Sequence, residues 1–300
     1  MKKKTYLFAL MAMVLTLGSC SDNENGIGGE TSKYITVSTS IGNMTRVATD
    51  AKGGQTFEEG DEISVYAWTG APTVAPETSE RVVNNAINKL TNGSWISTPQ
   101  MLWKNNREKH YFIGVYPTAA ISDLSAGEYT FDETKQVESD LLVAVNKDGL
   151  SYNVDEQQPV PLTFTHVMAK LVVNLTYKNQ WGGIPTVEKV VVGNAAKEAT
   201  INYLTKVVTP STTAKEDFSL PEITENTKYV SVIIPQEEVT QLTIVIGGKN
   251  FVYDNGTPFK LESGKITTVN LEVGRDEIKL GDVKITNWED GSTFSGEALN

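Results

Sequence analysis

Short runs that alternate apolar and polar residues, or that are rich in β-branched residues, recur between residues 34 and 288. Such runs are typical of β-strands, because successive side chains of a strand point to opposite faces of its sheet. The predicted strands span residues 34–41, 62–68, 109–116, 141–145, 160–164, 169–177, 187–192, 229–234, 241–246, 250–253, 266–273 and 283–288. Gly, Pro, Asn and Asp separate these runs, and this spacing favours β-sandwiches over alternating strands and helices.

Helical periodicity is scarce, and its best candidate is the stretch 80–90. Gly247-Gly248-Lys249 separates two predicted strands and predicts a short hairpin, because glycine adopts positive φ at little cost. An acidic stretch at 153–159 lacks any apolar period and marks a boundary between two halves. The sequence therefore predicts an all-β fold of two tandem β-sandwich domains, residues 33–160 and 161–300.

The first nineteen residues read as an export signal, with Lys2 to Lys4 followed by an apolar run over residues 6–17. This run is too short to cross a hydrocarbon core of ~30 Å as a helix, which favours a cleaved signal peptide over residues 1–19. The sequence LGSC at 17–20 resembles the lipobox of bacterial lipoproteins, which implies acylation of Cys20, for example with palmitate. Residues 20–32 are polar and Gly-rich, and they predict a lipidated cysteine followed by a flexible tether.

Charge and cysteine content narrow the classes of partner. Cys20 is the only cysteine of the chain, so no disulfide can form within it. The chain has 26 Lys and Arg against 37 Asp and Glu, a net charge of −11. A nucleic-acid partner requires a basic surface, and none is expected here. Acidic residues directly after Cys20 resemble the signal that sends lipoproteins of Bacteroides-type bacteria to the surface of the outer membrane.

Several short motifs, taken in order, resemble the fimbrillin family, the lipoprotein subunits of surface pili in Bacteroides-type bacteria. After the lipobox they are TRV at 45–47, FEEGD at 57–61, YP at 116–117, SDLL at 139–142, LTFTH at 162–166, AKL at 169–171, IIPQ at 233–236, GK at 264–265 and ITNWE at 285–289. Each motif alone is weak, but their order spans nearly the whole chain after Cys20. The resemblance implies two β-sandwich domains of transthyretin-like topology.

The same resemblance implies an assembly mechanism called donor-strand exchange. A protease would cut after Arg46 and remove the first strand, and a strand of a neighbouring subunit would then fill the groove. Val47 departs from the small residue that often follows this arginine in the family. The candidate displaced strand carries Ile35, Val37, Thr39 and Ile41 on one face.

The candidate donor strand lies in the tail at 277–288. Ile278 and Leu280 share one face, while Val283 and Ile285 share another register, with a bulge expected at Gly281. In the alternative interpretation, the first and last strands are ordinary strands of their own domains.

Enzymatic chemistry is not expected. The chain has two histidines, His110 and His166, and lacks a G-x-S-x-G nucleophile motif; for His166 a structural hydrogen bond is favoured over catalysis. One cysteine and two distant histidines do not make a metal site, and no cofactor is expected. The acidic residues at 58–62 are interpreted as a solvated strand entry rather than a glycosidase pair.

The prediction is therefore an outer-membrane surface lipoprotein that acts in cell adhesion as a fimbrium (pilus) subunit or adhesin. Its expected partners are other fimbrillin-like subunits or further copies of itself, the outer-membrane lipid and a host or bacterial surface ligand. The alternative is a monomeric surface glycan-binding lipoprotein that uses exposed tryptophans. For the five tryptophans, however, a buried or half-buried core position is favoured.

Overall fold

The computed structural model describes residues 33–42, 56–153, 158–239, 241–254 and 258–288. These residues form β-sheets, and their only helical elements are two single 3₁₀ turns, η1 (Thr78–Glu80) and η2 (Asn179–Trp181). Within the described ranges, no helix is long and apolar enough to cross a membrane.

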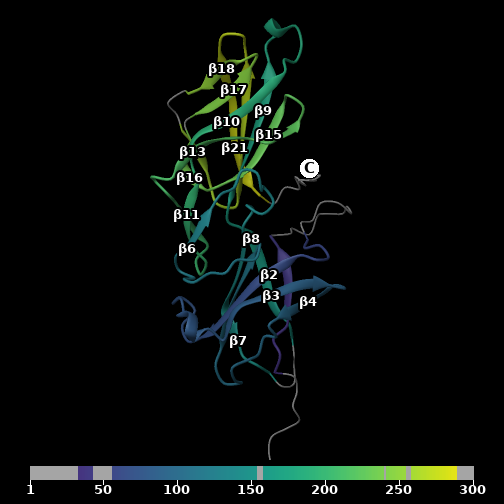
Figure 1. Cartoon of the computed structure of the whole chain (residues 1–300), viewed down its shortest axis with the longest axis vertical. Helices are drawn as coiled ribbons and strands as arrows, with labels where there is room; N and C mark the ends of the chain where they lie inside the picture. Colours follow the sequence, from purple (N-terminus) through teal and green to yellow (C-terminus); the bar gives the residue numbers. More distant parts are fainter. Residues whose placement is uncertain (1–32, 43–55, 154–157, 240, 255–257, 289–300) are drawn as a thin grey trace, which may run out of the picture. The chain divides into compact units, whose positions relative to one another are not determined.

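The first half of the chain builds a seven-stranded sheet in the order β1-β8-β7-β5-β2-β3-β4 (Figure 1). Its strands are β1 (Val37–Ile41), β2 (Glu62–Thr69), β3 (Val83–Thr91), β4 (Ser94–Thr98), β5 (His110–Tyr116), β7 (Leu142–Leu150) and β8 (Val160–His166). β1 pairs with β8 in parallel, and the other neighbours pair antiparallel. β1 and β4 are therefore the two edges of this sheet.

The interior strand β2 is buried on both faces. Ile63 and Val65 belong to a core that also contains residues of β1 and β8, whereas Tyr66 and Trp68 pack into a second, larger core. Gly114 of β5 leaves room in the first core, because a Cβ there would lie 2.6 Å from the Phe164 ring. This sheet thus positions β1 and β8 over a tightly packed interior.

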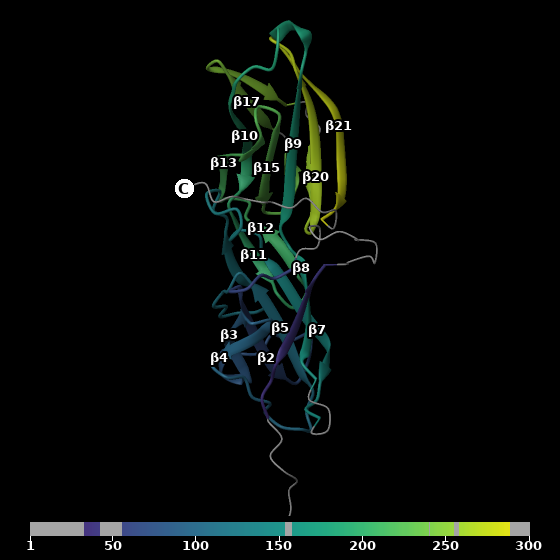
Figure 2. The same ribbon diagram turned by 90° about the vertical axis from the view of Figure 1, so that its right-hand side faces the viewer.

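The second half forms a five-stranded sheet in the order β14-β15-β9-β20-β21 and a four-stranded sheet in the order β13-β10-β17-β18. In Figure 2, β9, β20 and β21 lie side by side, with β21 at the edge. The strands are β9 (Ala169–Tyr177), β10 (Val187–Ala196), β13 (Lys215–Ser219), β14 (Glu222–Thr224), β15 (Lys228–Ile233), β17 (Leu242–Ile246), β18 (Lys249–Tyr253), β20 (Lys265–Val273) and β21 (Ile278–Asn287).

Two small sheets complete the fold, β12-β11-β6 and β16-β19. Their strands are β6 (Gly127–Thr130), β11 (Glu198–Asn202), β12 (Val207–Pro210), β16 (Gln236–Val239) and β19 (Phe259–Leu261). The hairpin between β17 and β18 turns at Gly247 and Gly248, which both have positive φ, 58° and 71°. The hairpin predicted at these glycines is confirmed.

The all-β fold is confirmed, and each of the twelve predicted strands is present. The helical candidate at 80–90 is wrong, because residues 83–91 form β3 and pair with both β2 and β4. The boundary expected between residues 160 and 161 falls at the start of β8, which pairs with β7 and β1 of the first sheet. The division into two domains stays a prediction.

Candidate functional site

The candidate site is built around β1, an edge strand with a single strand partner. Its five residues pair with β8 from Val37 opposite Val160 to Ile41 opposite Phe164. Just before β1, the Ile35 N–H donates to the Met101 carbonyl at 2.9 Å. At this point the chain is therefore also hydrogen-bonded to a segment other than β8. β1 is therefore held by one ladder along its length and by a short contact at its start.

The side chains of this segment alternate between the core and solvent. Ile35 is 1% exposed and Val37 is 6% exposed, and both belong to the core under the first sheet. Thr39 and Ile41 continue this face and are half-buried, while Ser38 and Ser40 are exposed. The four residues expected on one face of the first strand do share that face.

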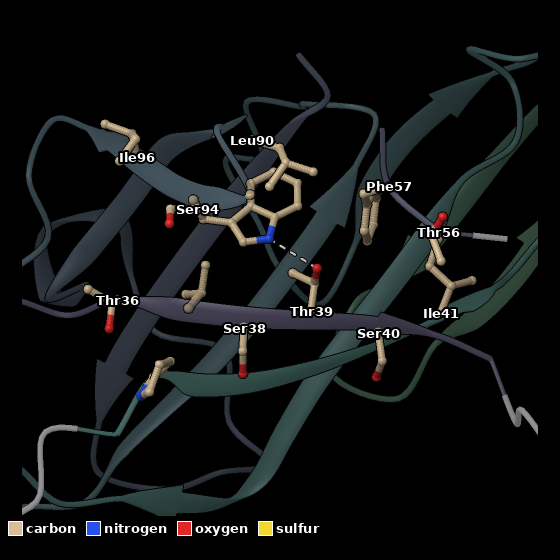
Figure 3. Close-up of a pocket in the computed structure, with 14 residues that line it drawn as sticks. Thr36, Ser38, Thr39, Ser40, Ile41, Thr56, Phe57, Leu90, Ser94 and Ile96 are labelled. Atoms are coloured by element: carbon tan, nitrogen blue, oxygen red, sulfur yellow. Dashed lines mark hydrogen bonds between the residues drawn. The ribbon is translucent and has the colours of Figure 1, made fainter. Parts of the chain in front are cut away.

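A groove of about 780 Å³ runs along β1 (Figure 3). Its opposite wall comes from the end of β3, the turn that follows it and β4, with Leu90, Trp95 and Ile96 in the lining. Figure 3 shows Thr39 pointing into the groove, with a dashed line from its hydroxyl to the indole nitrogen. The Trp95 indole N–H donates to the Thr39 hydroxyl at 3.0 Å and so connects the two walls.

Phe57, which lines this groove, belongs to a cluster of aromatic rings. The Phe57 ring meets three others edge-on, those of Trp95, Tyr116 and Phe164, at centroid separations of 5.3, 5.4 and 5.1 Å. Edge-to-face pairs at such separations are favourable beyond the area that they bury. Burial, and then the nearby Asp61 carboxylate, raise the pKa of Tyr116 to about 12, so this phenol stays neutral at physiological pH.

β21, the candidate donor strand, is the edge of the five-stranded sheet and pairs only with β20. Two of its residues, Gly281 and Asp282, lie opposite the single residue Asn270, and this is the bulge expected at Gly281. The bulge shifts the alternation by one residue. As a result, all four apolar side chains lie on one face, opposite buried residues of β20: Ile278, Leu280, Val283 and Ile285.

This face of β21 is incompletely covered. Ile278 and Leu280 are half-buried against the larger core, but Val283 is 37% exposed and Ile285 is 39% exposed. Most of the other residues of β21 are exposed as well. β21 therefore contributes less buried apolar surface to its own sandwich than its sequence would allow.

Trp288, directly after β21, is by contrast buried, with 7% of its surface exposed. The His166 ring stacks on its indole at a centroid separation of 4.1 Å, and the Lys170 ammonium lies 5.5 Å from the indole centroid. The His166 Nδ1 is 2.8 Å from Asp140 Oδ1. His166 thus has the structural hydrogen bond that was favoured for it.

The other residues considered for chemistry have structural partners. Asp61 accepts from the Glu58 N–H at 2.7 Å, and Glu62 pairs with Lys89 at 3.0 Å, as a solvated strand entry would. Burial lowers the pKa of His110, which accepts at Nε2 from the Lys104 N–H. Among the described residues, no three His, Cys, Asp or Glu side chains cluster as metal ligands would.

Two of the predicted site residues, Cys20 and Arg46, lie outside the described residues. The structure adds three groups that the sequence did not single out for the site, namely Trp95, Phe57 and Trp288 with its neighbours. Trp288 belongs to the ITNWE motif at 285–289. Its position at the end of an alternating run was the one sequence signal that could have indicated its burial. No local pattern marked Trp95 or Phe57 as neighbours of the first strand.

These features define an all-β sandwich protein whose first and last described strands are both sheet edges. The chain belongs to the fimbrillin-like family, whose model matches residues 45–288. This confirms the family resemblance of the sequence. Membership in this family indicates a structural role at the cell surface, in association with other fimbrial subunits.

Solved structures share the fold at low sequence identity. A candidate cell adhesion protein from Bacteroides uniformis matches with a TM-score of 0.65 and 17% identity, over 86% of this chain and 100% of that one. A second candidate cell adhesion protein, from Bacteroides ovatus, matches with a TM-score of 0.62 and 17% identity, over 85% and 98%. The tip fimbrial protein Mfa3 from Porphyromonas gingivalis, with a C-terminal truncation, matches with a TM-score of 0.50 and 11% identity, over 77% and 95%. Among curated proteins, no match is found.

Proposed function

We propose that this protein is a pilus subunit or adhesin that is exported, acylated at Cys20 and carried to the outer-membrane surface. A protease cuts after Arg46 and removes the segment that contains β1. The C-terminal strand β21 of a neighbouring subunit then takes the place of β1 beside β8. The lipid holds the subunit at the membrane until the cut, because the cut separates Cys20 from the rest of the chain.

The observation that carries this proposal is the combination of edge position and burial in β1. A strand with one neighbour can leave its sheet without breaking the pairing between any other strands. Its departure uncovers the ladder groups of β8 and the buried residues Val160, Leu162 and Phe164. The vacated site is then a groove with unpaired backbone groups and an apolar floor, which suits β-strand addition.

The energetic cost of losing β1 explains why removal and replacement are coupled. Burying Ile35 and Val37 stabilises the fold by roughly 3–6 kcal/mol at about 1.5–3 kcal/mol for each side chain. Net stabilities of domains are only about 5–15 kcal/mol. A subunit without β1 and without a replacement would be close to unfolding, so an incoming strand is strongly favoured.

β21 suits the role of donor for two reasons. As an edge strand with one partner it can separate from β20 without disturbing the remaining four strands of its sheet. Its apolar residues Val283 and Ile285 are more than a third exposed where they are, and they would be buried in an apolar groove. Transfer to a neighbour therefore gains apolar burial for these side chains.

The test is mass-spectrometric identification of the N-terminus of protein extracted from the cell surface. The proposal expects polymers that begin at Val47 and monomers that begin at acylated Cys20. Polymers whose subunits all retain residues 34–41 would contradict the exchange of β1. Polymers should also appear as SDS-resistant, heat-sensitive ladders on gels.

The alternative of a monomeric glycan-binding lipoprotein depended on exposed tryptophans. All five tryptophans lie in the part of the chain that the structure describes, and each is buried or half-buried. Trp95 and Trp181 also use their indole N–H groups in hydrogen bonds within the protein. No observation favours this alternative over the pilus subunit.

A further inference from the structure

The end of the candidate donor strand differs sharply from the strand itself. Along β21, Val283 and Ile285 are more than a third exposed, whereas Trp288, one residue past the strand, is 7% exposed. The backbone N–H of Trp288 donates to the Gly264 carbonyl at 3.2 Å, next to the start of β20. The firmest side-chain attachment of this segment is therefore at its end.

The surroundings of Trp288 are built from three separate parts of the chain, and we call the four residues Asp140, His166, Lys170 and Trp288 the Trp288 cluster. His166 ends β8, Lys170 lies near the start of β9, and Asp140 precedes β7. The indole and imidazole planes differ by 4°, so the two rings are stacked face to face. Lys170 is 2% exposed and lies within reach of a cation–π contact with the same indole.

Asp140 fixes the orientation of the ring that Trp288 stacks on. An ionised carboxylate can only accept hydrogen bonds, so in the 2.8 Å contact His166 Nδ1 carries the proton and donates to Asp140. This bond holds the imidazole plane in place before Trp288 packs against it. Asp140 also attracts the Lys170 ammonium, which otherwise carries its charge in a buried position.

One polar group of the cluster is not satisfied. Within the described part of the chain, the buried Trp288 indole N–H has no hydrogen-bond partner. A buried donor without an acceptor costs free energy that packing must offset. Trp288 is thus held by stacking on His166 and by the nearby Lys170 ammonium. The unsatisfied indole N–H offsets part of this stabilisation, which makes it easier for Trp288 to leave its site.

We propose that the Trp288 cluster is the anchor that keeps β21 in its own subunit until a second copy of this chain offers a vacated β8 edge. The inference rests on the proposed function, in which β21 is the donor strand. With Trp288 seated, β21 stays paired with β20. With Trp288 withdrawn, β21 is retained by a bulged edge ladder, by partly covered side chains and by two side-chain hydrogen bonds to β20, those of Asp282 and Asn287. The cluster then controls how fast one subunit can donate to the next.

The first arm of the test is amide hydrogen exchange on the monomeric, uncleaved chain. Trp288→Ala should raise exchange in residues 279–287 by about tenfold or more relative to wild type, while β9 and β15 keep their protection. Trp288→Phe keeps a ring that can stack on His166 and should stay within about threefold of wild type. Trp103→Ala, which removes a half-buried tryptophan from the segment between β4 and β5, is the matched control and should not expose residues 279–287 selectively.

The second arm measures the rate at which cleaved subunits form SDS-resistant ladders, where Trp288→Ala should be faster than wild type. Unchanged exchange in residues 279–287 would overturn the anchor and leave the proposed function standing. Faster exchange with unchanged or slower ladder formation would overturn control of assembly by Trp288. Ladders that form normally when residues 277–288 are deleted would overturn the donor role itself, and with it the proposed function.

Discussion

The Trp95 indole donates its N–H to the Thr39 hydroxyl at 3.0 Å, across the groove between β4 and β1. The two residues are 56 positions apart in the chain and lie on the two edge strands of one seven-stranded sheet. This bond is the one side-chain hydrogen bond that the structure gives between β1 and β4 within the described residues. A strand that must later leave is thus held by its ladder to β8, by the backbone bond from Ile35 to Met101 at its start, by the buried side chains of Ile35 and Val37, and by this one link to β4.

Thr39→Val should weaken the attachment of β1 without changing the size of the side chain. The variant leaves the Trp95 N–H without its acceptor in a half-buried site, so we expect a loss of about 1 kcal/mol in the free energy of unfolding. Urea unfolding of the uncleaved protein measures it. Thr36→Val changes an exposed threonine of the same segment and should have little effect. A double-mutant cycle with Trp95→Phe that shows no coupling would contradict the role of this bond.

Ile35→Ala should destabilise the uncleaved subunit but not the polymer. Removing most of a buried isoleucine side chain costs about 2–5 kcal/mol, because the cavity left behind collapses only in part. In polymers that begin at Val47 this residue is absent, so their thermal stability should match that of wild type. Ser38→Ala, at an exposed position of β1, is the control. An equal loss of stability in the polymer would mean that β1 is retained there.

Arg46→Ala should block maturation and leave monomers that keep β1. The segment that carries β1 can leave only if the chain is cut between it and the rest of the first sheet, and Arg46 is the residue at which the family resemblance expects that cut. Lys33→Ala is the matched control, because a cut after residue 33 would leave β1 in the protein. Gel ladders and N-terminal mass spectra measure the result. Ladders unaffected by Arg46→Ala would remove this cut from the mechanism.

Cys20→Ser should release the uncleaved protein from the membrane fraction. Acyl chains on the cysteine supply about 0.8 kcal/mol for each buried CH₂, and two or more chains are needed for stable anchoring. The comparison is best made in an Arg46→Ala background, since cleavage would itself separate the anchor from the rest of the chain. Fractionation with an antibody to the second half measures partitioning. Membrane association that survives the substitution would argue against the lipid anchor.

Strands were predictable from the sequence where buried and exposed side chains alternate along them, because this alternation appears directly as alternating apolar and polar residues. In the 34–41 run, Ile35 and Val37 face the core, and Ser38 and Ser40 face solvent, so the alternation in the sequence is the alternation in space. β3 was missed because it is largely polar and because Asn85 has a positive φ of 57° next to a register shift. Its strand conformation comes from pairing with β2 and β4 on its two sides, which no local pattern encodes.

The site was predictable only in part, for a similar reason. The bulge at Gly281 followed from two apolar pairs that are out of phase, which is a local signal. The contacts of Thr39 with Trp95 and of His166 with Trp288 join residues far apart in the chain and depend on how the strands are ordered in their sheets. The sequence named His166, Lys170 and Trp288 separately as motif residues, but only the fold brings them together.

Lys170 gives the Trp288 cluster a pH dependence with a definite sign. Burial is the main cause that lowers the pKa of Lys170 from its ordinary 10.5 to about 8. Between about pH 8 and 10.5 the unfolded chain therefore binds more protons than the folded one at this residue, so stability rises with pH across this window. Below pH 8 the folded protein carries the buried charge, and folding is then less favourable by roughly 3 kcal/mol than for a lysine whose pKa is the same in both states.

Lys170→Met should accordingly stabilise the protein at pH 7, by up to that amount, and abolish the rise in stability between about pH 8 and 10.5. Methionine fills the same space without a charge to desolvate, although it gives up the contact of the ammonium with the Trp288 indole. Urea unfolding at several pH values measures the difference from wild type, in which the titration of other groups cancels. Lys189→Met, at an exposed lysine on β10, controls for the loss of one positive charge. Parallel pH profiles for Lys170→Met and wild type would show that Lys170 carries no buried charge to titrate.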